Sequence, residues 1–145
     1  MSWLNYEFED VRKLVIKGHK GQKYGEYDYY WHLVSVADKV RFLYGNDKDL
    51  SKLVELAWCH DLLEDNPDFY NENVKPLLPK SMHESVEAIS KRIEETRSEY
   101  LDRCVKNEYA RKVKIADTMS NLEMSVKSND IRRVRKYSKQ IKEIM

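Results

Sequence analysis

Residues 53–66, with the sequence LVELAWCHDLLEDN, place a histidine and several acids among apolar side chains. In a helix that turns by about 100° per residue, Glu55 would lie on one side of this segment. His60, Asp61 and Glu64 would lie roughly opposite, among apolar residues, and would face inward. An unpaired imidazole or carboxylate in a protein core is costly. These side chains should therefore meet a metal ion, a proton partner or an internal water-filled pocket.

Two more polar side chains fall on the apolar faces of predicted helices. His32 opens a segment whose apolar residues recur at helical spacing, and Asp117 shares a face with Ala110 and Val113. A lone histidine in such a position is more often a hydrogen-bonded core residue than a ligand. Inward polar residues occur together on three predicted helices, however, and this joint occurrence favours a common site.

His32, His60, Asp61 and Asp117 together supply two imidazoles and two carboxylates from three predicted helices. This set suits a divalent cation such as Mn²⁺, Fe²⁺ or Zn²⁺, with positions left for water or substrate. Glu64 follows one turn after His60 and would be placed to orient the attacking water or take its proton. Asp65 lies beside it in the sequence.

The composition predicts a single all-α domain that positions these groups. A chain of 145 residues has the usual size of one domain, here residues 1–145. Only four glycines and three prolines, with 35% charged residues, are typical of a helical protein rather than a β-sandwich or a disordered chain.

The charge balance and the cysteine content restrict the possible partners. The chain has 26 Lys and Arg against 25 Asp and Glu, which gives no general argument for binding nucleic acid or an anionic membrane. No apolar run approaches the length of a membrane span. Cys59 and Cys104 are too few for a disulfide framework, so a reducing, cytoplasmic location is expected.

Periodicity and capping signals predict the order of the helices. An aromatic-rich loop at residues 21–31 and a loop at 68–80, with at most a short helical turn, should interrupt them. Ser81, with Glu84 three residues later, resembles a capping box. We expect helices at residues 6–20 (with Phe8, Val11, Leu14 and Val15 on its buried face), 32–44, 49–66, 81–95 (with Ile93 on its buried face), 98–106, 108–126 (with Asn107 as its cap) and 129–145.

Two of these segments have alternative interpretations. The aromatic loop could pack on the core or stack on a planar ligand, and packing is the commoner outcome. The last helix carries many Lys and Arg residues that could touch phosphates. A basic face of this kind is more often the solvated side of an amphipathic helix.

Four short motifs resemble those of the HD-domain metal-dependent phosphohydrolases, a compact helical-bundle family. They are similar, more narrowly, to the hydrolase domain of guanosine tetraphosphate (alarmone) hydrolases and their small stand-alone relatives. The resemblance extends over residues 11–122, most of the chain. The motifs are HKGQKYG at residues 19–25, YYWH at 29–32, HDLLED at 60–65 and KIADTMSNL at 114–122.

The resemblance implies a role for each matching residue. His32, His60, Asp61 and Asp117 would bind one Mn²⁺ ion, with Fe²⁺, Zn²⁺ or Mg²⁺ as alternatives, and Glu64 and Asp65 would position the attacking water. Asn121 would lie near the nucleoside, with Lys114 on the same helix face. The family commonly has an arginine that packs on guanine where this chain has Lys23 and Tyr24, and a proline where it has Leu33. Lys23, Tyr24 and Tyr29 would form the pocket wall.

Three functions follow from these observations. The first is hydrolysis of a nucleotide phosphate ester, most simply the 3′-pyrophosphate of guanosine tetraphosphate. The second keeps the same chemistry but acts on deoxynucleoside monophosphates. The third is a helical binding protein with a vestigial site, in which the basic last helix contacts a partner.

Overall fold

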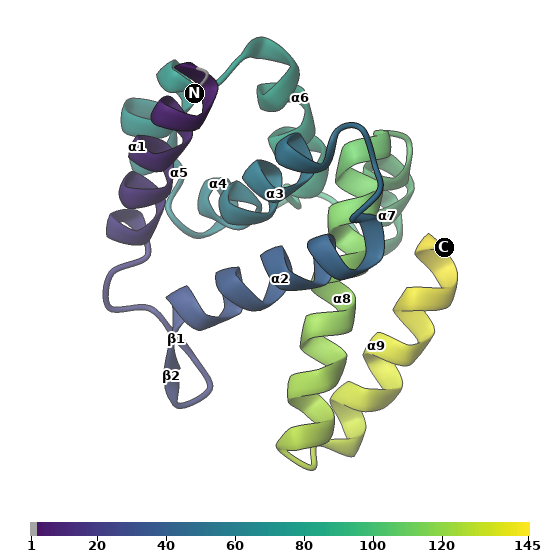
Figure 1. The fold of residues 1–145 in the computed structure, drawn as a ribbon. Coiled ribbons are helices and arrows are strands. Elements are labelled where there is room, and N and C mark those ends of the chain that lie inside the picture. The colour runs from purple at the N-terminus through teal and green to yellow at the C-terminus, as the bar shows by residue number, and fades with distance from the viewer. Residues whose placement is uncertain (1–2) are drawn as a thin grey trace.

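The computed structural model describes residues 3–145, and side chains from Glu9 onward. This part of the chain is all-helical apart from one short hairpin, as predicted (Figure 1). Its elements are α1 (Trp3–Gly18), β1 (Lys23–Tyr24), β2 (Tyr27–Asp28), α2 (Tyr29–Tyr44), α3 (Leu50–Cys59), α4 (Leu62–Asp65), α5 (Pro67–Phe69), the π-helix η1 (Tyr70–Val74), the 3₁₀-helix η2 (Lys75–Leu77), α6 (Lys80–Ile89), α7 (Arg97–Val105), α8 (Glu108–Lys127) and α9 (Ile131–Ile144).

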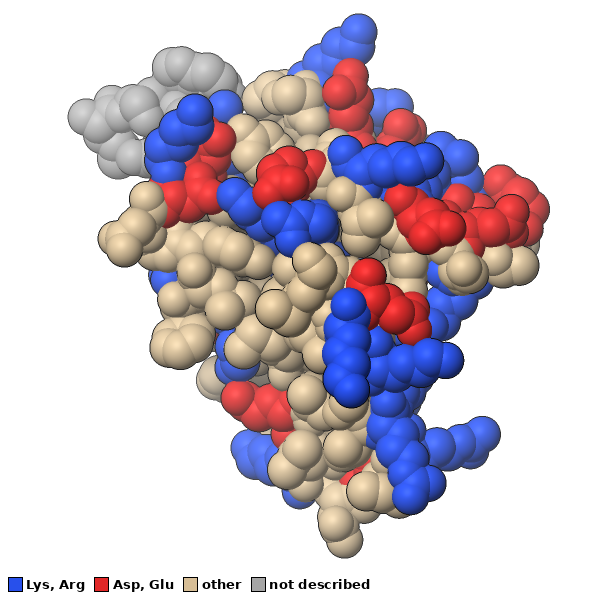
Figure 2. Space-filling view, turned by 90° about the vertical axis from the view of Figure 1, so that its right-hand side faces the viewer, with Lys and Arg blue, Asp and Glu red and all other residues tan. Residues whose placement is uncertain are grey.

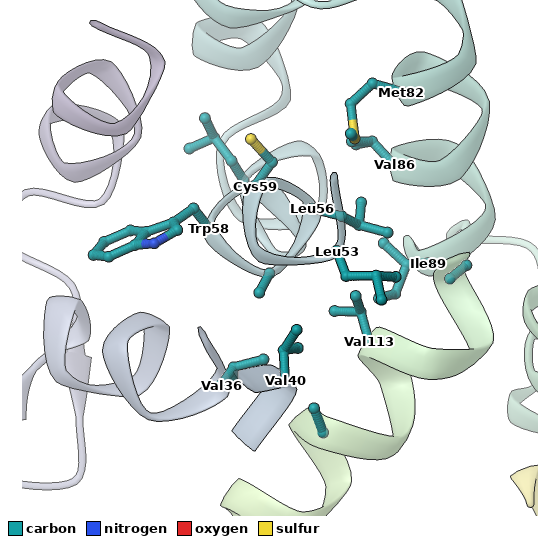
Figure 3. Packing of buried hydrophobic residues seen from close by; sticks show 14 of the residues in the cluster. Val36, Val40, Leu53, Leu56, Trp58, Cys59, Met82, Val86, Ile89 and Val113 are labelled. Carbon is teal, nitrogen blue, oxygen red and sulfur yellow. The ribbon is translucent and has the colours of Figure 1, made fainter. Parts of the chain in front are cut away.

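Helix α3 is the centre of the core. Every residue from Leu53 to Cys59 is buried, so α3 has no solvent-facing side over this length. Helices α1, α2, α6 and α8 pack around it. Figure 3 shows side chains of α3 pointing outward in several directions, toward Val36 and Val40 of α2, Met82, Val86 and Ile89 of α6, and Val113 of α8. Glu55, which the helical spacing places opposite the inward groups, is buried as well.

The aromatic loop contains an antiparallel hairpin that leads directly into α2. Strand β1 pairs with β2, with Lys23 opposite Asp28 and Tyr24 opposite Tyr27. Gly25 at the turn has a φ of +62°, a backbone conformation that favours glycine. The hairpin thereby holds Tyr24 and Tyr29 beside the first turn of α2, where His32 lies.

The predicted central helix is interrupted, which corrects the expectation of one helix over residues 49–66. Helix α3 ends at Cys59, His60 and Asp61 form a turn, and α4 begins at Leu62. Adjacent residues on an unbroken helix point about 100° apart. The interruption falls at the two residues whose side chains must converge.

Three other boundaries also differ from the expectations. Residues 67–77, predicted as a loop, form short helical segments because Tyr70 and Val74 bury their side chains against the core. Helix α6 begins after Pro79 without a capping box at Ser81, and it ends at Ile89, so that Ile93 is fully exposed. The side chain of Phe8 lies outside the described residues. Asn107 caps α8 as expected.

Gly18 allows α1 to approach the segment after the His60–Asp61 turn. A Cβ atom at Gly18 would lie 2.7 Å from the Leu62 Cδ1 atom and 2.7 Å from the Phe69 Cδ1 atom. Both distances are far below ordinary van der Waals contact. The missing side chain therefore determines how closely α1 packs on α4 and α5.

We predict that Gly18→Ala destabilises the fold, because overpacking costs about 1–3 kcal/mol and exceeds the gain in helix propensity. Thermal unfolding followed by circular dichroism should show a lower midpoint. Phe69→Leu should relieve part of the clash, so the double variant should lose less stability than the two single variants together. Strict additivity would contradict this explanation.

Candidate metal centre

The four predicted ligands meet in one buried group. His32 comes from the first turn of α2, His60 and Asp61 from the turn between α3 and α4, and Asp117 from the middle of α8. One ligand atom from each residue lies within 4.8 Å of the others. The prediction from the sequence that these side chains converge is confirmed.

Each imidazole in the group faces both carboxylates. His60 Nε2 lies 2.9 Å from Asp61 Oδ2 and 3.3 Å from Asp117 Oδ1. His32 Nε2 lies 3.0 Å from Asp117 Oδ1 and 3.6 Å from Asp61 Oδ2. The side chain of Asp61 is 21% exposed, whereas the other three are at most 5% exposed. Solvent or a ligand would therefore reach the group from the side of Asp61.

The hydrogen bonding of His60 fits a metal ligand. Its Nδ1 lies 2.6 Å from the carbonyl oxygen of Ala57, and because a carbonyl only accepts, Nδ1 carries the proton. This bond fixes the ring and leaves Nε2, which lies beside the two carboxylates, as the atom that could bind a metal once it has lost its proton. Buried Nε2 makes no well-directed hydrogen bond within the described part of the chain, although it touches two carboxylates. A cation bound by Nε2 and the carboxylates would satisfy all three groups.

The charges of the group are strongly coupled in the absence of metal. Burial alone would lower the pKa of His60, but Asp61 and Asp117 outweigh it and raise the pKa well above its usual value. The pKa of His32 is raised for the same reason. Burial would raise the pKa of Asp117, but Lys114 and His60 hold it well below its usual range. In the metal-free group the two carboxylates therefore favour the protonated form of both imidazoles.

Neighbouring side chains fix the orientation of both carboxylates. Tyr29 donates a hydrogen bond from its hydroxyl to Asp61 Oδ2. Lys114 Nζ lies 3.1 Å from Asp117 Oδ2, and Asn121 Nδ2 donates to Asp117 Oδ1 at 3.2 Å. Three residues predicted to contact substrate thus lie beside the group, where they also hold the ligands in place.

Tyr24 covers the imidazole of His32. The two rings stack with their centroids 4.4 Å apart, and the Tyr24 hydroxyl donates to Asn121 Oδ1 at 2.6 Å. The adjacent hollow has a volume of only about 60 Å³, far below the few hundred Å³ of a typical ligand pocket. Lys23 is more remote, since its exposed ammonium pairs with Asp28 across the hairpin at 2.6 Å.

The two predicted catalytic acids lie at the surface of α4 rather than inside the core. Glu64 accepts a hydrogen bond from the backbone N–H of Lys91 at 2.5 Å, and burial of its carboxylate raises its pKa. Asp65 accepts from Gln22 Nε2 at 2.9 Å and lies 4.0 Å from His19 Nδ1. The inward orientation predicted for Glu64 is therefore wrong, because Glu64 is exposed.

The basic residues of α9 are exposed, as the interpretation as a solvated face expected, and some of them also lie near the site. The charges of Arg133 and Asp117 both affect the pKa values of Tyr24 and Tyr137, so these groups lie close together. The pKa of Lys136 is lowered by burial and by nearby Arg97, Arg133 and Lys114. Figure 2, viewed from the side on which α9 lies in Figure 1, shows Lys and Arg side chains gathered along its lower right.

Comparison with models of protein families found no match, and comparison with curated proteins found no similar sequence. Among the described residues, no helix is long and apolar enough to cross a membrane. Cys59 and Cys104 are both buried and free. The fold and the site therefore define an all-helical domain with a buried His/His/Asp/Asp group that could hold a metal ion.

We predict that the chain binds one divalent metal ion and that Asp61→Ala abolishes binding while the protein remains helical. Metal content after loading with Mn²⁺ and desalting measures the effect. Asp102→Ala, which removes an exposed carboxylate from α7, is the matched control and should retain the metal. Full occupancy in the Asp61 variant would rule out this ligand set.

We also predict that metal uptake releases protons. The pKa values of His32 and His60 are raised in the metal-free protein, and both imidazoles must be neutral to bind a cation. Metal affinity should therefore increase as the pH rises toward these pKa values. The imidazolium contribution to the stability of the metal-free fold is complete below about pH 6.5 and is lost at higher pH.

Calorimetric titration of metal in buffers of different ionisation enthalpy measures the proton release. The apparent enthalpy should change linearly with the buffer's ionisation enthalpy. An enthalpy that is the same in all buffers would contradict the protonated state of the group.

Proposed function

We propose that this protein is a divalent-metal-dependent phosphohydrolase that acts on a nucleotide. The observation that supports this proposal is the convergence of His32, His60, Asp61 and Asp117 within 4.8 Å. Mixed imidazole and carboxylate ligands suit Mn²⁺, Fe²⁺ or Zn²⁺ better than Ca²⁺. Bound there, the ion would polarise a phosphoryl oxygen and lower the pKa of water.

The side chains around the group favour an anionic substrate. Lys114, Arg133 and Lys136 bring positive charge to the side where α8 and α9 border the site, and Arg97 adds to it. These cations repel one another, as the lowered pKa of Lys136 indicates. A polyphosphate would relieve that repulsion. This charge supports a nucleotide with several phosphates over a monophosphate.

The ring of Tyr24 is our candidate for contact with the base. It stacks on His32 and reaches Asn121, so the same ring could cover a planar ligand if the hairpin moved. The substrate we propose is guanosine tetraphosphate or a similar 3′-pyrophosphate, with pyrophosphate as the product. Because Lys23 and Tyr24 replace the arginine that packs on guanine in the alarmone hydrolases, we expect guanine and adenine forms to be distinguished poorly.

Anion-exchange analysis of the products tests the proposal. The Mn²⁺-loaded protein is incubated with guanosine tetraphosphate, its adenosine counterpart and a panel of deoxynucleoside monophosphates. Pyrophosphate release from the 3′ position supports the proposal. Orthophosphate from monophosphates, with the tetraphosphate unchanged, would indicate the nucleotidase alternative.

Two controls separate a weak enzyme from a contaminant or an inactive site. Asp117→Asn removes one ligand charge and should abolish turnover, whereas Asp102→Asn should leave turnover unchanged. Absence of any phosphate release by a protein that carries stoichiometric metal would favour a binding protein with a vestigial site.

Glu64→Gln tests the proposed proton acceptor. The amide oxygen of glutamine can still accept from the Lys91 N–H, which Glu64 contacts at 2.5 Å, but the side chain can no longer take a proton. Turnover should fall by roughly 100-fold if Glu64 is the general base. Metal content and thermal midpoint should not change.

The control for this substitution is Glu84→Gln, an exposed exchange of the same kind on α6. It should have full activity. Unchanged turnover in the Glu64 variant would show that Glu64 is not the general base. Its role would then be structural, as the acceptor of the hydrogen bond from the Lys91 backbone.

A further inference from the structure

A cavity of about 500 Å³ lies between the C-terminal half of α1 and the start of α2. In Figure 1 these segments are on the left, away from α8 and α9. The cavity is lined by none of the four candidate metal ligands. Its volume falls within the range of small-molecule sites. The lining comprises Lys13, Ile16, Lys17, His19, Lys20, Gly21, Gln22, Asp28, Tyr29, Tyr30 and Leu33.

The lining carries an excess of positive charge. Lys13 and Lys17 are one turn apart on α1, and Lys20 follows in the loop, so three exposed lysines line one cavity. No carboxylate pairs with any of the three within the part of the chain that the structure describes. Asp28, the single acid of the lining, is already paired with Lys23. An anion would therefore be attracted here without having to displace an existing ion pair.

The cavity also offers apolar and aromatic surface. Ile16 and Tyr30 are each 39% exposed, and both line the cavity. The ring of Tyr30 is held in place by an edge contact with Trp58, with centroids 5.8 Å apart. A fixed ring and an aliphatic side chain can contact the flat face of a base. Inorganic phosphate alone would leave this surface unused.

We propose that this cavity is a second binding site, for a nucleoside diphosphate or a similar phosphorylated nucleoside. The lysines bind its phosphates, and the base lies against Tyr30 and Ile16. Three lysines grouped around one cavity suit a single compact anion. A nucleic-acid strand would instead need positive charge distributed along a track.

The second site shares a wall with the metal centre. Tyr29 lines the cavity and donates its hydroxyl hydrogen bond to Asp61. Gln22 also lines it and donates to Asp65 at 2.9 Å. A ligand in the cavity would therefore contact side chains that hold a candidate metal ligand and a candidate catalytic acid. The nucleotide would act as an effector of the centre, with no role as its substrate.

Binding in the absence of metal tests the proposal independently of any hydrolysis. The full chain in EDTA is titrated calorimetrically with GDP, ADP, guanosine and inorganic pyrophosphate. GDP and ADP should bind with similar affinity, and guanosine and pyrophosphate should both bind more weakly. Guanosine or pyrophosphate that binds as tightly as GDP would overturn the nucleotide assignment, as would the absence of GDP binding.

Matched double variants locate the site. Lys13→Ala with Lys17→Ala should weaken GDP binding by about tenfold or more, because two of three charge-assisted contacts are lost. Lys139→Ala with Lys142→Ala removes the same charge from exposed positions on α9 and should leave binding unchanged. An equal loss in both double variants would mean nonspecific attraction and would overturn the site.

Variants of the metal centre provide the remaining test. Asp117→Asn and Arg133→Ala should both bind GDP like the unmodified chain, since neither residue lines the cavity and the hydrogen-bond and ion-pair partners of Asp117 do not line it either. If either variant lost GDP binding while the Lys13 and Lys17 variant kept it, the nucleotide would be at the metal centre and the second site would be refuted. Circular dichroism of each variant excludes loss of fold as the cause.

Discussion

Two buried carboxylates placed side by side are the constraint on which the rest of the structure depends. Asp61 and Asp117 would repel each other, and neither could remain ionised in the core without compensation. Lys114 and the two imidazoles provide that compensation, and their contacts are between 2.9 and 3.6 Å. The packing of α2, α3 and α8 around one another brings these charges together. A divalent ion would supply the same compensation more compactly than two protons.

Helix α8 does much of this positioning from a single face. Lys114 and Asn121 lie three residues before and four residues after Asp117, so all three side chains share one side of the helix. Thr118 accepts a hydrogen bond from Gln140 Nε2 at 2.8 Å, which ties α8 to α9. This contact holds Arg133 and Lys136 of α9 near the candidate metal ligands.

The spacing of apolar residues predicted the long helices approximately, and the inward polar residues on three of them predicted the convergence of the four ligands. Capping and spacing rules predict the boundaries of α7 and α8 well, because these boundaries depend on residues nearby in the sequence, such as Asn107. They fail at His60 and Asp61, where tertiary contacts break a helix whose sequence has no glycine or proline. They also fail at Glu64, because its orientation follows from that break. The role of Arg133 could not be predicted, since it depends on how α9 packs on α8.

The hydrogen bond between Tyr24 and Asn121 joins residues 97 positions apart, and that between Ser35 and Ser120 spans 85. The ligand group draws on the same distant segments, because His32 lies on α2 and Asp117 on α8. Such contacts form late in folding, after the entropy of closing a long loop has been overcome. The ligand group therefore cannot be complete in a nascent chain that ends before α8. The metal would enter only after the C-terminal third of the protein has been synthesised, and it would stabilise a finished fold rather than nucleate one.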